Sequence, residues 1–369
     1  MKKLGFGLMR LPYTDPSNRA AVDREAVKRM VDTFLDHGFG YFDTAYPYQA
    51  GASEGIFGEL VAARHPRTAY ELTTKLPIFL AERPEDYDRY FAEQLQRCRV
   101  DYFDNYLLHG LGEASYGEVE RLDGFGFLAR KKAEGRVRRI GFSYHGGAAL
   151  LEQILTQHPE TELVQLQINY VDWEDRGIQA RRCYEVCARR KIPVAVMEPL
   201  KGGALARPPR EAARLLKNCR PQDSFACWGL RFAAPLEQVE VVLSGMGSQE
   251  QLEDNLHTME TLQPLSPEER RTLQRVVGIV RASMAIPCTG CSYCTDGCPK
   301  GIQIPAYFAL YNNQKQFGTT PGVLAAYENL CANSGMPEAC IACGHCETRC
   351  PQRLPIIENL RLTAEVFRT

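Results

Sequence analysis

The chain has 369 residues, 44% of them hydrophobic, and a formal net charge of −1. This length predicts one large domain followed by a small one. No run of five or more Lys and Arg occurs, so we expect neither a nucleic-acid partner nor a membrane surface as partner. Residues 1–12 are too short for a signal-peptide core, and no later segment approaches a membrane span. Fourteen cysteines without a secretory signal indicate reduced thiols in a cytoplasmic protein.

Short β-branched or aromatic runs alternate with longer amphipathic stretches up to about residue 262. These runs predict eight strands, at Gly5–Met9, Gly40–Asp43, Glu71–Lys75, Phe103–His109, Arg138–Ser143, Leu163–Asn169, Pro193–Glu198 and Val239–Ser244. The stretches between them predict helices, first from the N-cap Asp23 to Gly38 and then over approximately 52–64, 84–98, 117–134, 147–157, 176–190, 209–233 (broken near Pro221) and 249–262. Their number and length predict a (β/α)₈ TIM barrel. A doubly wound sheet is the alternative, although no Gly-x-Gly-x-x-Gly opens a helix after the first strand.

A change of composition near Pro287 marks the predicted domain boundary. Leu265–Met284 is predicted as a connecting helix with Ser266 as its cap and Pro267 in its first turn. The chain then becomes rich in Cys, Gly and Pro, with helical patterns at Pro305–Lys315 and Pro321–Ala332. We therefore assign residues 1–280 to the barrel and 281–369 to a small all-helical domain.

The small domain carries the pattern C-x₂-C-x₂-C-x₃-C-P twice. Such spacing is typical of [4Fe–4S] clusters, in which three cysteines of one run and the fourth of the other bind each cluster. We assign Cys288, Cys291, Cys294 and Cys350 to a first cluster, and Cys340, Cys343, Cys346 and Cys298 to a second. Zinc sites and disulfides are the alternatives, but zinc usually takes two separated C-x₂-C pairs. The segment resembles the all-helical dicluster ferredoxin module found in the iron–sulfur subunit of succinate dehydrogenase.

Polar side chains close three adjacent strands of the predicted barrel. The second strand ends at Asp43, the third at Lys75 and the fourth at His109. Tyr48 lies in the loop that follows the second strand. Functional groups of a (β/α)₈ barrel project from the C-terminal ends of its strands. Each residue alone has a structural explanation, as a turn cap or a core group. Together they predict a site in which a buried Lys paired with Asp lowers the pKa of Tyr48, the phenol protonates a carbonyl oxygen as hydride arrives, and His109 orients that carbonyl.

Residues 1 to about 262 resemble the aldo-keto reductase family. The motifs that carry the resemblance are Gly5-Phe6-Gly7, Asp43-Thr44-Ala45-Tyr46-Pro47-Tyr48, Lys75 and Leu107-Leu108-His109. It implies a catalytic tetrad of Asp43, Tyr48, Lys75 and His109. It also implies that Ser143 and Gln167 bind the nicotinamide carboxamide. The segment around Gly245 and Ser248, with Gln251, Asp254 and Asn255, resembles the family's adenosine-phosphate loop at a helix N-terminus.

Two positions depart from the family's pattern. Met197 stands where many members stack an aromatic ring on the nicotinamide, and a thioether can also cover a ring. Gly245 and Gln251 replace the basic residues that bind the 2′-phosphate, with Lys201 as a candidate substitute. The resemblance therefore implies NADPH or NADH as cofactor. The segment Met197–Gly203 and the two Cys-Pro runs resemble the branch of the family with a C-terminal ferredoxin module.

The two halves pose an electronic problem, because nicotinamide transfers two electrons as hydride whereas each cluster accepts one. Three functions remain open. The barrel reduces a small carbonyl or oxidises an alcohol, and the clusters are structural or sense redox state. Alternatively, the clusters pass electrons between a redox protein partner and a substrate at Tyr48. As a third possibility, the protein is a non-catalytic electron-transfer or redox-sensing module.

Overall fold

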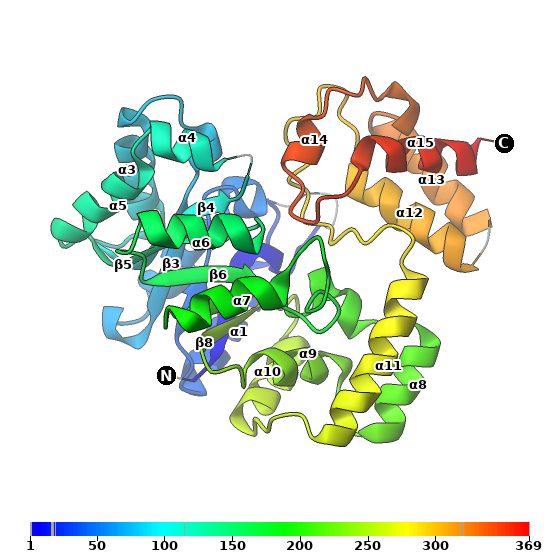
Figure 1. Cartoon of the computed structure of the whole chain (residues 1–369), viewed down its shortest axis with the longest axis horizontal. Coiled ribbons are helices and arrows are strands. Elements are labelled where there is room, and N and C mark those ends of the chain that lie inside the picture. Colours follow the sequence, from blue (N-terminus) through cyan, green and yellow to red (C-terminus); the bar gives the residue numbers. More distant parts are fainter. Residues whose placement is uncertain are drawn as a thin grey trace. The chain divides into compact units, whose positions relative to one another are not determined.

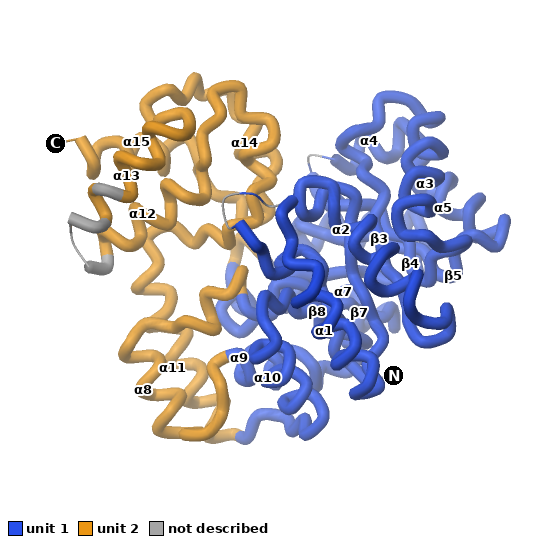
Figure 2. Tube along the Cα trace, turned by 180° about the vertical axis from the view of Figure 1, so that it is seen from behind, with its two compact units in different colours: residues 1–175, 179–200, 226–266 blue, residues 176–178, 201–225, 267–369 orange. Residues whose placement is uncertain are grey.

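The computed structural model describes residues 2–15, 18, 20–113, 115–317, 319 and 321–368. The chain divides into two compact units (Figure 2). The first comprises residues 1–175, 179–200 and 226–266, and the second comprises residues 176–178, 201–225 and 267–369. Two short segments from the barrel half of the sequence thus belong to the second unit.

The first unit is built on a closed barrel of eight parallel strands in sequence order (Figure 1). The strands are β1 (Leu4–Gly7), β2 (Tyr41–Asp43), β3 (Glu71–Leu76), β4 (Phe103–Leu111), β5 (Val137–Tyr144), β6 (Leu163–Gln167), β7 (Val194–Met197) and β8 (Val239–Ser244). The barrel closes where β1 pairs with β8, with Phe6 opposite Ser244. This pairing confirms the predicted (β/α)₈ barrel and excludes the doubly wound sheet, whose edges stay open.

Helices of the first unit are α1 (Arg24–Asp36), α2 (Ser53–Phe57), α3 (Glu85–Cys98), α4 (Tyr116–Arg121), α5 (Gly124–Ala133), α6 (Ala148–Gln157), α7 (Ala180–Arg189) and α10 (Gln249–Glu260), with most of α9 (Phe225–Ala233). Helix α1 shows why they form: the Asp23 carboxylate accepts a hydrogen bond from the backbone of Ala26, and the helix buries Val27, Met30 and Phe34. The single helix predicted over 117–134 is wrong. The chain breaks between α4 and α5, where Asp123 adopts a left-handed backbone conformation at φ 55°.

The second unit consists of α8 (Arg210–Cys219), α11 (Pro267–Ser283), α12 (Ile304–Phe317), α13 (Pro321–Asn333), α14 (His345–Thr348) and α15 (Ile356–Phe367) (Figure 1). Its core includes Tyr307, Phe308, Ile356 and Leu360. The helical architecture predicted for the C-terminal region is confirmed. No helix in the described part of either unit is long and apolar enough to cross a membrane.

Candidate active site and iron–sulfur sites

An ion pair lies at the C-terminal ends of β2 and β3. The Lys75 Nζ donates hydrogen bonds to both carboxylate oxygens of Asp43, at 2.8 and 2.9 Å, and to the backbone carbonyl of Thr44 at 2.8 Å. Both side chains are buried, with Lys75 only 1% exposed. Three acceptors therefore fix the position of the ammonium group inside the barrel mouth.

Tyr48 and His109 lie beside this pair. Tyr48 begins a 3₁₀ turn, Tyr48–Gly51, that follows β2, and the Lys75 Nζ lies 5.0 Å from the centre of its ring. The His109 ring, at the end of β4, meets the Tyr48 ring edge to face with 5.8 Å between centres. The structure thus brings together all four residues of the predicted tetrad.

Burial controls the electrostatics of the tetrad. It raises the pKa of Asp43 and lowers the pKa of Lys75, and the charge of each partner opposes that shift in the other. Burial also lowers the pKa of His109 well below its usual value, with further contributions from the charges of Lys75 and His145. His109 is therefore a neutral imidazole at neutral pH, able to donate one hydrogen bond.

Sequence reasoning missed several residues that support or border the tetrad. Gln165, on β6, forms a hydrogen bond with Asp43. Behind Lys75, the Gln94 amide donates to the Lys75 carbonyl at 3.0 Å and to the buried Glu54 carboxylate at 2.5 Å. Phe79, after β3, places its ring 5.7 Å from the His109 ring and is 42% exposed. The polar residues of β6 are the one local pattern that could have revealed Gln165.

The predicted nicotinamide ligands lie along the ends of β5, β6 and β7. The Ser143 hydroxyl accepts a hydrogen bond from the backbone of Gly110 at 2.8 Å. The Gln167 amide donates to Asp172 at 2.8 Å. Met197 pairs in register with Gln167. The structure thus places Gln167 and Met197 next to each other at the end of the barrel that holds the tetrad.

The predicted phosphate loop precedes α10. Ser248 caps this helix by accepting a hydrogen bond from the backbone of Gln251, and the Gln251 side chain accepts one from the backbone of Gly247 at 2.8 Å. Asn255 donates to the Ser244 hydroxyl at 2.9 Å. Gly245 packs against the side chain of Arg10, since a Cβ there would lie 3.1 Å from the Arg10 Cβ. Asp254 lies on the same helix.

Lys201 does not belong to the barrel unit. It lies in the segment 201–225 of the second unit, where its Nζ donates to the Gln352 side chain at 3.4 Å. Its predicted role toward the 2′-phosphate stays a prediction.

The cysteines of the predicted first cluster gather in the second unit. The Cys294 thiol is buried, and burial raises its pKa, with added contributions from Cys291, Cys288 and Cys350. Such interactions require the fourth cysteine, Cys350, to lie near the run Cys288–Cys294. The arrangement therefore fits a cluster held by three cysteines of one run and one of the other.

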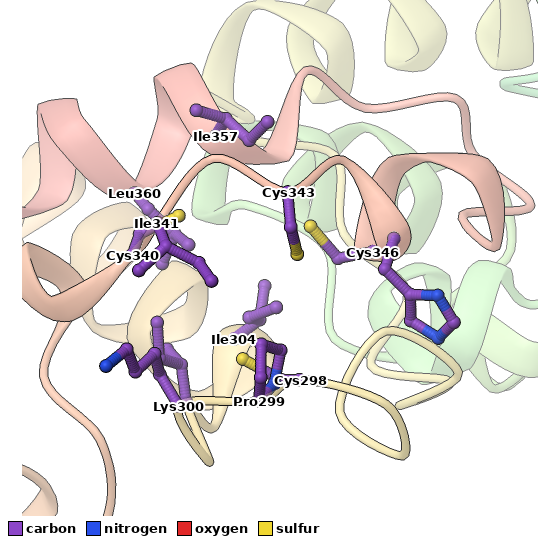
Figure 3. A pocket seen from close by; sticks show the side chains of 12 residues that line it. Cys298, Pro299, Lys300, Ile304, Cys340, Ile341, Cys343, Cys346, Ile357 and Leu360 are labelled. Atoms are coloured by element: carbon purple, nitrogen blue, oxygen red, sulfur yellow. The ribbon is translucent and has the colours of Figure 1, made fainter.

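The cysteines of the predicted second cluster line one pocket (Figure 3). Cys298 approaches it from one side, and Cys340, Cys343 and Cys346 come from the other run. Ile304, Ile357 and Leu360 supply apolar walls. The donor set fits a [4Fe–4S] cubane, whose iron atoms take thiolate ligands.

The closed barrel of eight parallel strands defines the class of protein as a (β/α)₈ barrel. The sequence pattern of the Aldo/keto reductase family matches residues 3–277, and the chain belongs to that family. A second pattern, the 4Fe-4S dicluster domain, matches residues 287–354. The predicted family, its branch with a C-terminal iron–sulfur domain, and the oxidoreductase class are thereby confirmed.

Relatives agree with this assignment. The uncharacterized oxidoreductase YtbE of Bacillus subtilis is 29% identical over 181 residues, which are 47% of this chain and 59% of that protein, less than two thirds of its length. An aldo-keto reductase from Bacillus halodurans in its holo form has a similar fold, with a TM-score of 0.60 and 23% identity over 74% of this chain and 91% of that one. An aldo-keto reductase from Klebsiella pneumoniae in complex with NADPH matches with a TM-score of 0.59 and 20% identity, over 74% of this chain and 90% of that one.

Proposed function

We propose that this protein transfers hydride between a nicotinamide cofactor and a small carbonyl or alcohol, with Tyr48 as general acid. The observation that carries this proposal is the buried Lys75–Asp43 pair beside the ring of Tyr48, with the neutral His109 ring also in contact with Tyr48. An ammonium group held by three acceptors beside a phenol stabilises the phenolate formed when that phenol gives up its proton.

The residues act in sequence on the substrate oxygen. His109, as a neutral donor, hydrogen-bonds the carbonyl oxygen and polarises it. Nicotinamide supplies the hydride when it is bound. Tyr48 then gives its proton to the oxygen, and Lys75 stabilises the resulting phenolate while Asp43 holds Lys75 in place. Phe79, exposed beside His109, supplies an apolar wall for the substrate.

The cofactor sites follow from the same rim. Ser143 and Gln167 bind the carboxamide, Met197 covers the nicotinamide ring, and the loop from Gly245 to Ser248 binds the adenosine phosphate of NADPH or NADH. Cys288, Cys291, Cys294 and Cys350 hold one cluster, and Cys298, Cys340, Cys343 and Cys346 hold the other. Fourteen cysteines without a disulfide among them support a cytoplasmic location.

Replacing Tyr48 tests the acid. In Tyr48→Phe we expect nicotinamide-dependent carbonyl reduction to fall by roughly 10²–10⁴-fold, because the proton donor is lost. The cluster absorbance stays at the wild-type level. Tyr46→Phe is the matched control, because the Tyr46 hydroxyl in the same loop donates to Glu93 and takes no part in the proposed reaction. Wild-type activity in Tyr48→Phe would refute the role of Tyr48.

Exposure at the second cluster site favours a second function, electron exchange with a redox partner. Cys343 is exposed, and the neighbouring Ile341, which lines the same cavity, is 56% exposed. A cluster held there lies near the surface and is accessible to a one-electron carrier. Anaerobic addition of NADH or NADPH separates the functions: a reduced-cluster EPR signal favours electron exchange, and bound nicotinamide with oxidised clusters favours hydride transfer alone. A protein that binds no nicotinamide would instead be a non-catalytic module.

A further inference from the structure

We infer that the first cluster site positions the segment that follows β7, so that nicotinamide affinity depends on this cluster and not on the second. The inference rests on the proposed nicotinamide binding at the rim. It concerns Lys201, Gly202 and Gly203, which begin four residues after the end of β7 and belong to the second unit.

The segment forms a tight turn against the first cysteine run. Lys201, Gly202 and Gly203 all have positive φ, of 47°, 65° and 96°. A Cβ on Gly202 would lie 2.2 Å from the carbonyl oxygen of Thr289, so only glycine allows this approach. Thr289 directly follows Cys288, a ligand of the proposed first cluster. The turn therefore rests on the backbone of that ligand segment.

A second contact reaches the same site from the other cysteine run. The Lys201 Nζ donates to Gln352 at 3.4 Å. The neighbouring Arg353 donates to the backbone carbonyl of Gly177 at 3.2 Å, and Gly177 lies in the segment 176–178, between β6 and α7. Gln352 and Arg353 closely follow Cys350, the remaining ligand of the first cluster. Both barrel-derived segments of the second unit thus contact residues next to Cys288 or Cys350.

The second cluster site lacks this relation among its lining residues. Its cavity is lined by residues 298–304, 340–346, 357 and 360, all within the small domain. Loss of that cluster would leave the contacts of the turn with Thr289 and Gln352 intact.

Chain connectivity ties the turn to the nicotinamide end of the barrel. Met197, at the end of β7, is five residues before Gly202. Five extended residues span at most about 18 Å. The turn thus stays within that distance of the residue proposed to cover the nicotinamide ring, however the two units are arranged.

Binding of the first cluster provides the coupling. Cys288 and Cys350 are distant in sequence, and a shared cluster holds their segments together. Without it, the link between Cys288 and Cys350 is lost, although the second cluster still joins the two runs through Cys298, and the turn loses the contacts with Thr289 and Gln352. Through the chain this freedom reaches Met197, the residue proposed to cover the nicotinamide ring, so binding has to order more of the chain and the measured affinity falls.

Paired ligand variants test the role of each cluster. NADPH and NADH are titrated by cofactor fluorescence into anaerobically purified Cys294→Ser and Cys346→Ser, with iron content and EPR to establish which cluster each has lost. We expect the Kd of Cys294→Ser to rise about tenfold or more, which corresponds to a loss of roughly 1.4 kcal/mol of binding free energy. The Kd of Cys346→Ser should stay within about twofold of the wild-type value. Equal weakening, or no change in either variant, would overturn the inference.

Paired glycine variants test the turn with both clusters present. Gly202→Ala clashes with Thr289, whereas a Cβ on Gly203 meets nothing within 4 Å. Both substitutions strain a positive φ, so Gly203→Ala controls for strain alone. We expect the Kd for nicotinamide to rise more in Gly202→Ala than in Gly203→Ala, with cluster EPR unchanged. Equal values of Kd in the two variants would contradict the role assigned to the contact between Gly202 and Thr289.

Limited trypsin digestion provides a readout without nicotinamide. Cleavage after Lys201 is expected to accelerate in Cys294→Ser and to stay at the wild-type rate in Cys346→Ser, as followed by mass spectrometry. If the wild-type protein bound no nicotinamide, the proposed function would fail, and the digestion would still decide whether the first cluster holds the turn. Equal cleavage rates in the two variants would overturn that coupling.

Discussion

Lys75 and Asp43 form a buried ion pair whose two charges depend on each other. Lys75→Met leaves the Asp43 carboxylate buried without its partner, so we expect the free energy of unfolding of the barrel to fall by about 3–5 kcal/mol. The double variant Asp43→Asn/Lys75→Met removes both charges and should be more stable than the single variant. Urea unfolding followed by circular dichroism measures both. The single variant Asp43→Asn completes the comparison. If the double variant lost as much free energy of unfolding as the two single variants together, the two charges would not interact.

His109 links stability to pH, because its imidazole is held neutral. Its folded pKa lies well below the ordinary value of 6.5, so only the unfolded chain takes up a proton just below pH 6.5. Stability from this residue is complete above that pH and is lost as the pH falls, by up to about 1.4 kcal/mol per pH unit. In His109→Gln this part of the slope should disappear from urea unfolding curves recorded between about pH 7 and about pH 5.5. An unchanged slope would mean that His109 titrates alike in both states.

Sequence reasoning predicted that Asp43, Lys75 and His109 lie together because each ends a predicted apolar strand, and the structure places them side by side with Tyr48. It missed Gln165 and Glu54. Gln165 contacts Asp43 from β6, which is distant along the chain. The Glu54 carboxylate is held in place by hydrogen bonds that it accepts from Thr74 and Gln94. Such partners meet only after the barrel closes, and no local spacing marks them.

At the level of strands, Gly141 sets the spacing between β5 and β6. It pairs with Leu163, and a Cβ on it would lie 1.8 Å from the Leu163 carbonyl oxygen. We expect Gly141→Ala to lower the free energy of unfolding by about 1–3 kcal/mol or more, because a backbone atom has to move. Gly117→Ala in α4 is the control, since nothing lies within 4 Å of its Cβ, and it should be neutral or stabilising. Equal effects from the two variants would contradict this account.

The strands could be predicted to within a few residues, because each is a short apolar run between turn residues. The first was predicted too long: β1 ends at Gly7, and Leu8–Arg10 form a 3₁₀ turn. The break between α4 and α5 was not predictable, since Asp123 interrupts an otherwise continuous helical pattern only through its backbone conformation. Periodicity predicts which face of an element is buried but not where a single residue turns the chain.

On the scale of the whole molecule, the sequence correctly indicates a barrel followed by a helical iron–sulfur domain. It does not indicate that residues 176–178 and 201–225 belong to the second unit. Their attachment depends on contacts between distant segments, such as that of Gly202 with Thr289, which leave no periodic pattern. The resemblance of Met197–Gly203 to the iron–sulfur branch of the family does not predict that Gly202 contacts Thr289.

The clusters should stabilise one unit and not the other. The second unit buries Cys294 and Cys346 in its core, with Cys288, Cys298, Cys340 and Cys350 packed against it, whereas the barrel core contains none of the eight. Iron removal leaves these thiols in a core shaped around two clusters, so we expect that unit to unfold.

Anaerobic treatment with an iron chelator, followed by thermal unfolding, measures this difference. We expect the loaded protein to show an additional transition that disappears with the iron, and the barrel transition to remain, because the eight-stranded core is complete without the clusters. Protease digestion of the iron-free protein should then remove residues after about 285 and also cut within the segment 201–225, while the eight-stranded barrel core stays folded. Loss of the barrel transition together with the iron would instead show that the two units fold as one cooperative body, with the clusters supporting the tetrad as well as their own domain.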